Sequence, residues 1–190
     1  TELAYDVLVL SPGGETIKPP IPGVELALPL RTVEDMDALI ARVETAPAHV
    51  TVIGGGFIGV EVAENLRHRN IPVTLVEATS QVLAPIDPEM VQNVHKVMEF
   101  NGIDLRLNAQ ATAIESNAVV LASGERITTE LVVLAIGVRP DITLAKQIGL
   151  EEGTFPYQQF VATGTIAQPK PKTFAQMTAE ERGQTFDDLF

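Results

Sequence analysis

The sequence contains no cysteine, and this absence excludes several kinds of chemistry. A chain of 190 residues without a thiol forms no disulfide, offers no thiolate nucleophile and has no thiolate metal site. Tryptophan is also absent, and aromatic residues make up only 5% of the chain. The 45% hydrophobic content is therefore mostly valine, isoleucine, leucine and alanine, which favours a parallel sheet covered by helices.

Basic residues are scarce, with 13 Lys and Arg against 25 Asp and Glu and a net charge of −12. Nucleic acids and anionic membrane surfaces both need clustered cations to bind, so the charge argues against either partner. No apolar run approaches the ~20 residues of a membrane span, and the sequence does not open with a basic segment followed by an apolar one. These features predict a cytoplasmic protein.

The three histidines, His49, His68 and His95, are not at metal-ligand spacing, and we interpret them as surface or packing residues. Neither a nucleophile elbow nor a phosphate-binding P-loop occurs in the sequence. We therefore predict no metal site and no catalytic residue within this chain alone.

Hydrophobic periodicity predicts an α/β fold with a Rossmann-like parallel sheet, helices and an antiparallel β-meander. The helix at 33–44 should begin with a capping box made by Thr32 and Asp35. A further helix should start at Asp87 and Pro88, with Met90, Val94, Val97 and Met98 on one face, and end at Gly102. The expected strands are 7–10, 50–53, 73–76, 104–107 and 131–136, and the meander should span 111–128.

Three glycines between a predicted strand and a predicted helix match a dinucleotide-binding turn. Gly54 would permit the tight turn, Gly56 would let backbone approach a pyrophosphate, and Gly59 would let helix and strand pack closely. Glu77 ends the next strand about 20 residues after Gly54, where a carboxylate can accept hydrogen bonds from both ribose hydroxyls, and we expect Glu77 and the following Ala78 to bind the cofactor. No Lys or Arg occurs between 71 and 90, so the sequence favours NAD(H) over NADP(H). A turn that binds nothing and a solvated Glu77 remain the alternatives.

Three motifs carry a resemblance to a known family: GGGFIGVE at 54–61, AIGVRPD at 135–141 and YDVLVLSPGGETIKPPIPG at 5–23. They resemble the FAD-dependent pyridine nucleotide–disulfide oxidoreductases, most closely the branch of coenzyme A-disulfide reductase, NADH oxidase and persulfide reductase. The resemblance implies that Phe57 shields a flavin, Ile58 lies near the nicotinamide and Glu61 lies near its carboxamide. It also implies that the Ile136 and Gly137 backbone lies beside the nicotinamide ribose. Core packing is the alternative for Phe57.

The sequence departs from the resembled family in the flavin-binding parts. It lacks the first glycine turn for FAD, the redox-active cysteine and a Gly-Asp pair at the flavin ribityl site. The resemblance therefore implies a flavin-domain stub at 1–31, an NAD(H)-binding domain at 32–150 and an unmatched linker and helical tail at 151–190.

Two function classes follow from these features. The chain is expected to be an NAD(H)-binding oxidoreductase domain that does not hold FAD and needs a flavin-containing partner polypeptide, and it is catalytically incomplete alone. The alternative is an interaction or oligomerisation module with a vestigial nucleotide site. Apolar residues in the tail, such as Phe186 and Phe190, would then cover a bare surface or pair two copies, unless the tail is loose. The chain being one piece of a larger protein is a third possibility.

Overall fold

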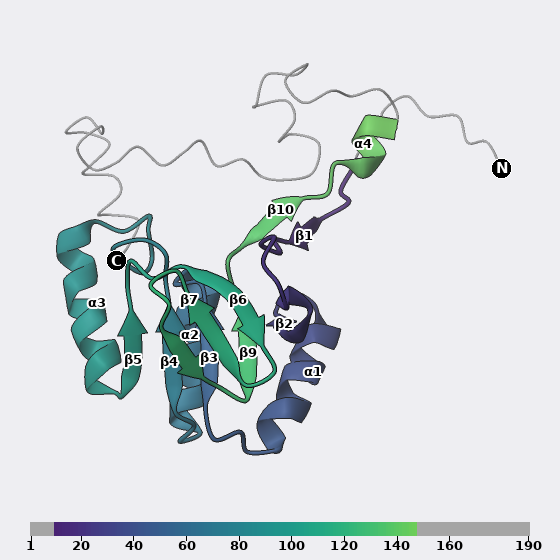
Figure 1. Ribbon diagram of the computed structural model, residues 1–190. Helices are drawn as coiled ribbons and strands as arrows, with labels where there is room; N and C mark the ends of the chain where they lie inside the picture. The colour runs from purple at the N-terminus through teal and green to yellow at the C-terminus, as the bar shows by residue number, and fades with distance from the viewer. Residues whose placement is uncertain (1–9, 148–190) are drawn as a thin grey trace, which may run out of the picture. The chain divides into compact units, whose positions relative to one another are not determined.

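The computed structural model describes residues 10–147 and divides the chain into two compact units (Figure 1). The larger unit is Glu15–Arg139. The described residues of the smaller unit, 10–14 and 140–147, include the short helix α4 (Thr143–Gln147). The predicted tail at 151–190 and most of the predicted strand at 7–10 lie outside the described residues.

A five-stranded parallel sheet forms the centre of the larger unit (Figure 1). Its strand order is β2-β9-β3-β4-β5, and the register pairs Ile53 with both Val76 and Leu134, so three neighbouring strands end at one level. Every residue of β3, β4 and β9 is buried, as expected for parallel strands covered on both faces. The bounds are β2 (Leu28–Pro29), β3 (Val50–Ile53), β4 (Val73–Val76), β5 (Ile103–Arg106) and β9 (Leu131–Leu134).

Three helices, α1 (Val33–Glu44), α2 (Phe57–His68) and α3 (Pro88–Phe100), contribute to one hydrophobic core with the sheet. The predicted capping box at the start of α1 is confirmed, because Asp35 N donates to Thr32 Oγ1 at 3.2 Å and Thr32 N donates to Asp35 Oδ2 at 2.9 Å. The longest of these helices has 13 residues. Within residues 10–147, no helix has the length and apolar character that a membrane crossing requires.

The antiparallel meander covers a second core, so the predicted fold class is confirmed. It consists of β6 (Ala111–Glu115), β7 (Ala118–Leu121) and β8 (Arg126–Thr128), and Figure 1 shows β6 and β7 crossing in front of the parallel sheet. Ile114, Val119 and Leu121 pack there with sheet residues such as Ile53 and Val76. The remaining elements are a 3-10 turn, η1 (Val24–Leu26), and the paired strands β1 (Gly14–Thr16) and β10 (Val138–Pro140).

The structure corrects half of the predicted face of α3. Met98 is buried and Val94 packs against the core as predicted, but Met90 and Val97 are 65% and 59% exposed. The pattern did not include two residues of the helix that are buried, Val91 and His95. Asp87 is the N-cap residue as predicted, but its side chain makes no capping hydrogen bond.

The strand bounds also differ from the prediction at several places. The strand expected at 104–107 corresponds to β5, which begins and ends one residue earlier. The strand expected at 131–136 corresponds to β9, which ends at Leu134. The edge strand β2 was not predicted, because two residues ending in proline do not form a recognisable strand pattern.

Three polar side chains are linked by hydrogen bonds near the start of β3. His49 Nε2 lies 3.1 Å from Thr74 Oγ1, and that hydroxyl donates to Asp104 Oδ2 at 3.1 Å. Since the hydroxyl has one proton, Nε2 must be the donor to Thr74, which assigns the tautomer from the network. His49 Nδ1 is buried with no partner among the described residues. Burial lowers the pKa of His49 below its ordinary value of 6.5, and the charge of Asp104 partly opposes this.

We predict that His49 makes the fold sensitive to mild acid. A lowered pKa means that the unfolded chain binds a proton more readily than the folded chain between the two pKa values. Stability is therefore full above about pH 6.5 and declines as the pH falls toward the folded-state pKa. The substitution His49→Gln should reduce the loss in urea midpoint between about pH 7.5 and pH 5.5. His68→Gln, on the exposed end of α2, is the control, and equal losses in both variants would contradict the prediction.

Candidate functional site

The glycine turn connects the carboxyl end of β3 to α2, and two of its glycines are required by close packing. Gly54 has φ of +109°, and a Cβ on it would lie 2.5 Å from Ala135 O. A Cβ on Gly59 would lie 1.9 Å from Gly54 O. Larger residues at either position would force the backbone apart, so these two glycines hold α2 against the end of the sheet.

Gly56 is different, because no packing constraint explains it. It is the N-cap of α2, with φ of −72° and ψ of −177°, a conformation open to any residue. A Cβ at this position would meet no atom within 4 Å. No side chain among residues 10–147 caps the helix. The first-turn N–H groups and the positive end of the helix dipole therefore face open space, which is the arrangement that binds phosphate.

Glu77 lies at the end of β4 with its carboxylate fixed against the glycine turn. Oε2 accepts from Gly55 N at 2.7 Å, and Oε1 accepts from the backbone N and the hydroxyl of Thr79 at 2.8 Å and 2.7 Å. The contacts of Gly55 and Thr79 were not predicted from the sequence. No local sequence signal indicates either contact, because both depend on how the chain folds after β4.

Two residues assigned to the nicotinamide end, Ile58 and Glu61, line one groove together with Val138. The groove lies between α1 and α2, has a volume of about 650 Å³ and is mostly apolar. Phe57 is not among the residues that line it, and its side chain is 59% exposed. Phe57 therefore does not pack in the core, which was the alternative for this residue.

The motif that contains Ile136 and Gly137 follows β9 and lies next to the glycine turn. Ala135 N donates to Ile53 O at 2.8 Å, so both motifs leave the same edge of the sheet. Ile136 is half-buried against the meander core, and Gly137 is exposed with φ of +109°. Ala78 is exposed directly after Glu77. Within residues 10–147, no three His, Asp or Glu side chains group as metal ligands.

Over residues 1–180 the chain matches the pyridine nucleotide-disulphide oxidoreductase family. The chain belongs to this family. The resemblance read from the three sequence motifs is thereby confirmed. Among curated relatives in this family, the NADH oxidase of Methanocaldococcus jannaschii is 38% identical over 161 residues. That match covers 81% of this chain and 36% of the relative.

Several solved structures share the fold. Reduced Bacillus anthracis CoADR-RHD is 49% identical, with a TM-score of 0.75, over 80% of this chain and 28% of that one. The water-forming NADH oxidase of Lactobacillus brevis, solved bound to NADH, is 27% identical with a TM-score of 0.71, over 77% of this chain and 34% of that one. Its engineered NADPH oxidase variant, solved bound to NADPH, is 26% identical with a TM-score of 0.72, over 78% of this chain and 34% of that one. The chain thus spans well under half of each of these proteins.

We predict that substitution by alanine destabilises the protein much more at Gly59 than at Gly56. Gly59→Ala places a methyl group 1.9 Å from Gly54 O and should lower the free energy of unfolding by about 2 kcal/mol or more. Gly56→Ala enters open space and should lower it by about 1 kcal/mol at most, the cost of a poorer N-cap. Urea unfolding of both variants measures the difference. A stable Gly59→Ala variant would show that the close approach of α2 is not required.

Proposed function

We propose that this chain binds NAD(H) at the glycine turn and provides the nicotinamide cofactor for an oxidoreductase whose flavin is held by another polypeptide or domain. The supporting observation is the 2.7 Å contact between Gly55 N and Glu77 Oε2, which joins the turn and the carboxylate into one site. In this proposal residues 32–150 are the NAD(H)-binding domain.

The diphosphate of the cofactor would lie over Gly56. The open space at Gly56 and the uncapped first turn of α2 fit a diphosphate, since its oxygens would accept from N–H groups that no side chain among residues 10–147 occupies. The backbone can approach closely only because Gly56 lacks a side chain. This fit supports a resident dinucleotide and is independent of the resemblance.

Glu77 would hold the adenosine ribose and favour NAD(H) over NADP(H). Its oxygens keep lone pairs beyond those used by Gly55 and Thr79, and a 2′-phosphate would face its negative charge. The engineered NADPH oxidase offers support: its substitutions include an aspartate replaced by alanine and, at the next position, an alanine replaced by arginine. This chain has the same order, an acid at Glu77 followed by Ala78.

The nicotinamide would enter the groove that Ile58, Glu61 and Val138 line. Bound NADH supplies a hydride, and the chain's own residues would orient the ring: Ile58 by contact with its face and Glu61 by accepting from the carboxamide. Residues 1–190 contain neither the first glycine turn for FAD of the resembled family nor a cysteine to receive electrons. In this proposal the hydride acceptor is a flavin held by another polypeptide or by another domain.

One observation favours the second candidate, an interaction module with a vestigial nucleotide site. Met36 and Ile40 of α1 are exposed in the groove, beside the buried Leu39 and Val43 of the same helix. Exposed apolar side chains in one groove are typical of a surface that another protein covers. Nucleotide binding decides between the two candidates, because a vestigial site would not bind NADH.

We predict that the full chain binds NADH and that Gly56→Ala weakens binding. The methyl group would occupy the space that the diphosphate needs, so the dissociation constant should rise at least about tenfold. Titration followed by NADH fluorescence measures both constants, and circular dichroism checks that the variant is folded. An unchanged spectrum for the parent chain at millimolar NADH would reject the proposal in favour of the interaction module.

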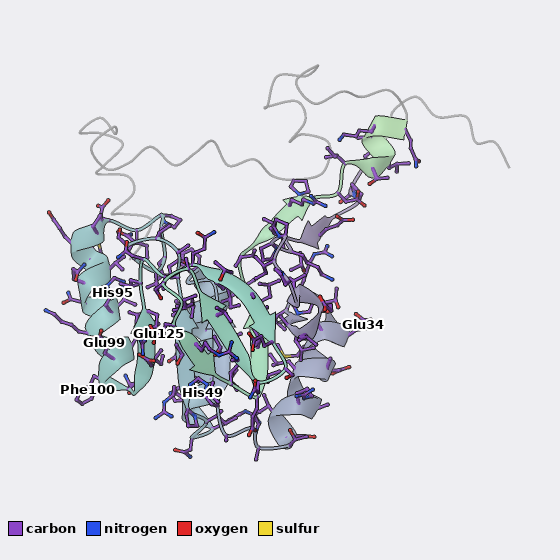
Figure 2. The ribbon with its side chains drawn as sticks, in the orientation of Figure 1. Glu34, His49, His95, Glu99, Phe100 and Glu125 are labelled. Carbon is purple, nitrogen blue, oxygen red and sulfur yellow. The ribbon has the colours of Figure 1, made fainter. Side chains whose placement is uncertain are left out.

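We also predict that Glu77→Ala combined with Ala78→Arg reverses the cofactor preference. The pair removes a carboxylate that repels the 2′-phosphate and adds a cation that attracts it, so the ratio of NADPH to NADH affinity should rise by about 100-fold or more. Titration of both cofactors measures the ratio. Glu99→Arg on α3 is the control, since it changes the net charge equally at a different place (Figure 2). A similar rise in that control would mean that overall charge, not Glu77, sets the preference.

A further inference from the structure

The loop between β4 and α3 folds back against the glycine turn. Leu83 N donates to Gly55 O at 2.7 Å, and Val82 is completely buried. A Cβ on Gly55 would lie only 2.8 Å from Val82 Cγ1, so the Val82 side chain packs directly on the backbone of the turn. The position of this loop therefore determines the wall of the site next to Gly55 and Glu77.

A buried histidine holds the loop in this position. His95 lies on α3 (Figure 2), is only 6% exposed, and its Nε2 accepts from Val82 N at 3.2 Å. Within residues 10–147 no other acceptor for this N–H is present. A buried amide without a partner is costly, because water cannot replace the lost hydrogen bond. His95 must also be neutral, with its proton on Nδ1, to accept at Nε2.

We propose that His95 is a positioning residue for the adenosine half of the dinucleotide site, an inference that rests on the proposed NAD(H) binding. The connection has three contacts: His95 Nε2 holds Val82 N, the Val82 side chain packs on Gly55, and Gly55 N holds the Glu77 carboxylate. His95 does not touch the ribose in this scheme. It acts by keeping the wall of the site closed around Glu77.

Loss of the acceptor would open this wall. With an apolar residue at position 95, the Val82 N–H can recover a hydrogen bond only if the loop moves toward water. Val82 would then leave Gly55, and the backbone that donates to the Glu77 carboxylate would lose the side chain that packs against it. The effect should fall on the adenosine half of the ligand, because the groove with Ile58 and Glu61 lies on the α1 side of α2 and does not include the loop.

The test compares three variants of the full chain by titration with NADH and with ADP-ribose, which lacks the nicotinamide. His95→Leu should raise both dissociation constants about tenfold. His95→Gln, whose Oε1 can accept from Val82 N, should restore binding to within about threefold of the parent chain. Met98→Ala is the matched control: it removes a buried side chain from the same helix and core, so it should lower the melting temperature and leave both constants unchanged.

Amide hydrogen exchange at Val82 separates failure of this inference from failure of NAD(H) binding. Exchange should be faster in His95→Leu than in Met98→Ala at equal loss of stability, and this holds without any nucleotide. Unchanged exchange, or unchanged affinity in His95→Leu, would overturn the role of His95. If the parent chain binds neither NADH nor ADP-ribose, the proposed function fails. The role of His95 in binding then fails too, even if the exchange at Val82 changes as expected. If His95→Leu does not fold, Val82→Ala keeps the backbone bond, removes the packing on Gly55 and should weaken binding similarly.

Discussion

The hydrogen bond from Gly55 N to Glu77 Oε2 is the contact on which the candidate site depends. It forms because β3 and β4 are in register, with Ile53 opposite Val76, and because Gly54 N donates to Val76 O at 2.8 Å. The two strands therefore end level, and the first side chain after β4 reaches the turn after β3. A shift of one residue in β4 would turn the Glu77 side chain to the other face of the sheet.

The two cores keep this arrangement rigid. Helices cover one face of the sheet and the meander covers the other, and the residues of β3, β4 and β9 are buried between them. Such close-packed interiors resist small displacements. Gly59 extends the rigidity to α2 by allowing its backbone to approach Gly54, so the uncapped end of the helix has one position relative to Glu77. The geometry of the candidate site is therefore set by packing within the protein.

The sequence predicted the elements whose signals are local. The bounds of α1 and its capping box follow from Thr32 and Asp35, and β3, β4 and the glycine turn follow from short apolar runs and glycine spacing. The inward face of α3 was predicted only in part, since Met98 is buried as expected but Met90 and Val97 are exposed, and periodicity alone does not separate them from the buried Val91. The contacts of Gly55, Thr79 and His95 with their partners were not predictable, because they depend on how the loop after β4 folds.

The two candidate functions are linked by the physical requirements of hydride transfer. A hydride moves only between atoms in contact and in a site from which water is excluded. The groove beside Ile58 and Glu61 is apolar, with Met36 and Ile40 exposed in it. If the nicotinamide enters this groove, the acceptor must come from a second surface that covers the same side chains. The exposed apolar residues that favour an interaction module are thus what an NAD(H)-binding domain needs when its flavin is held elsewhere.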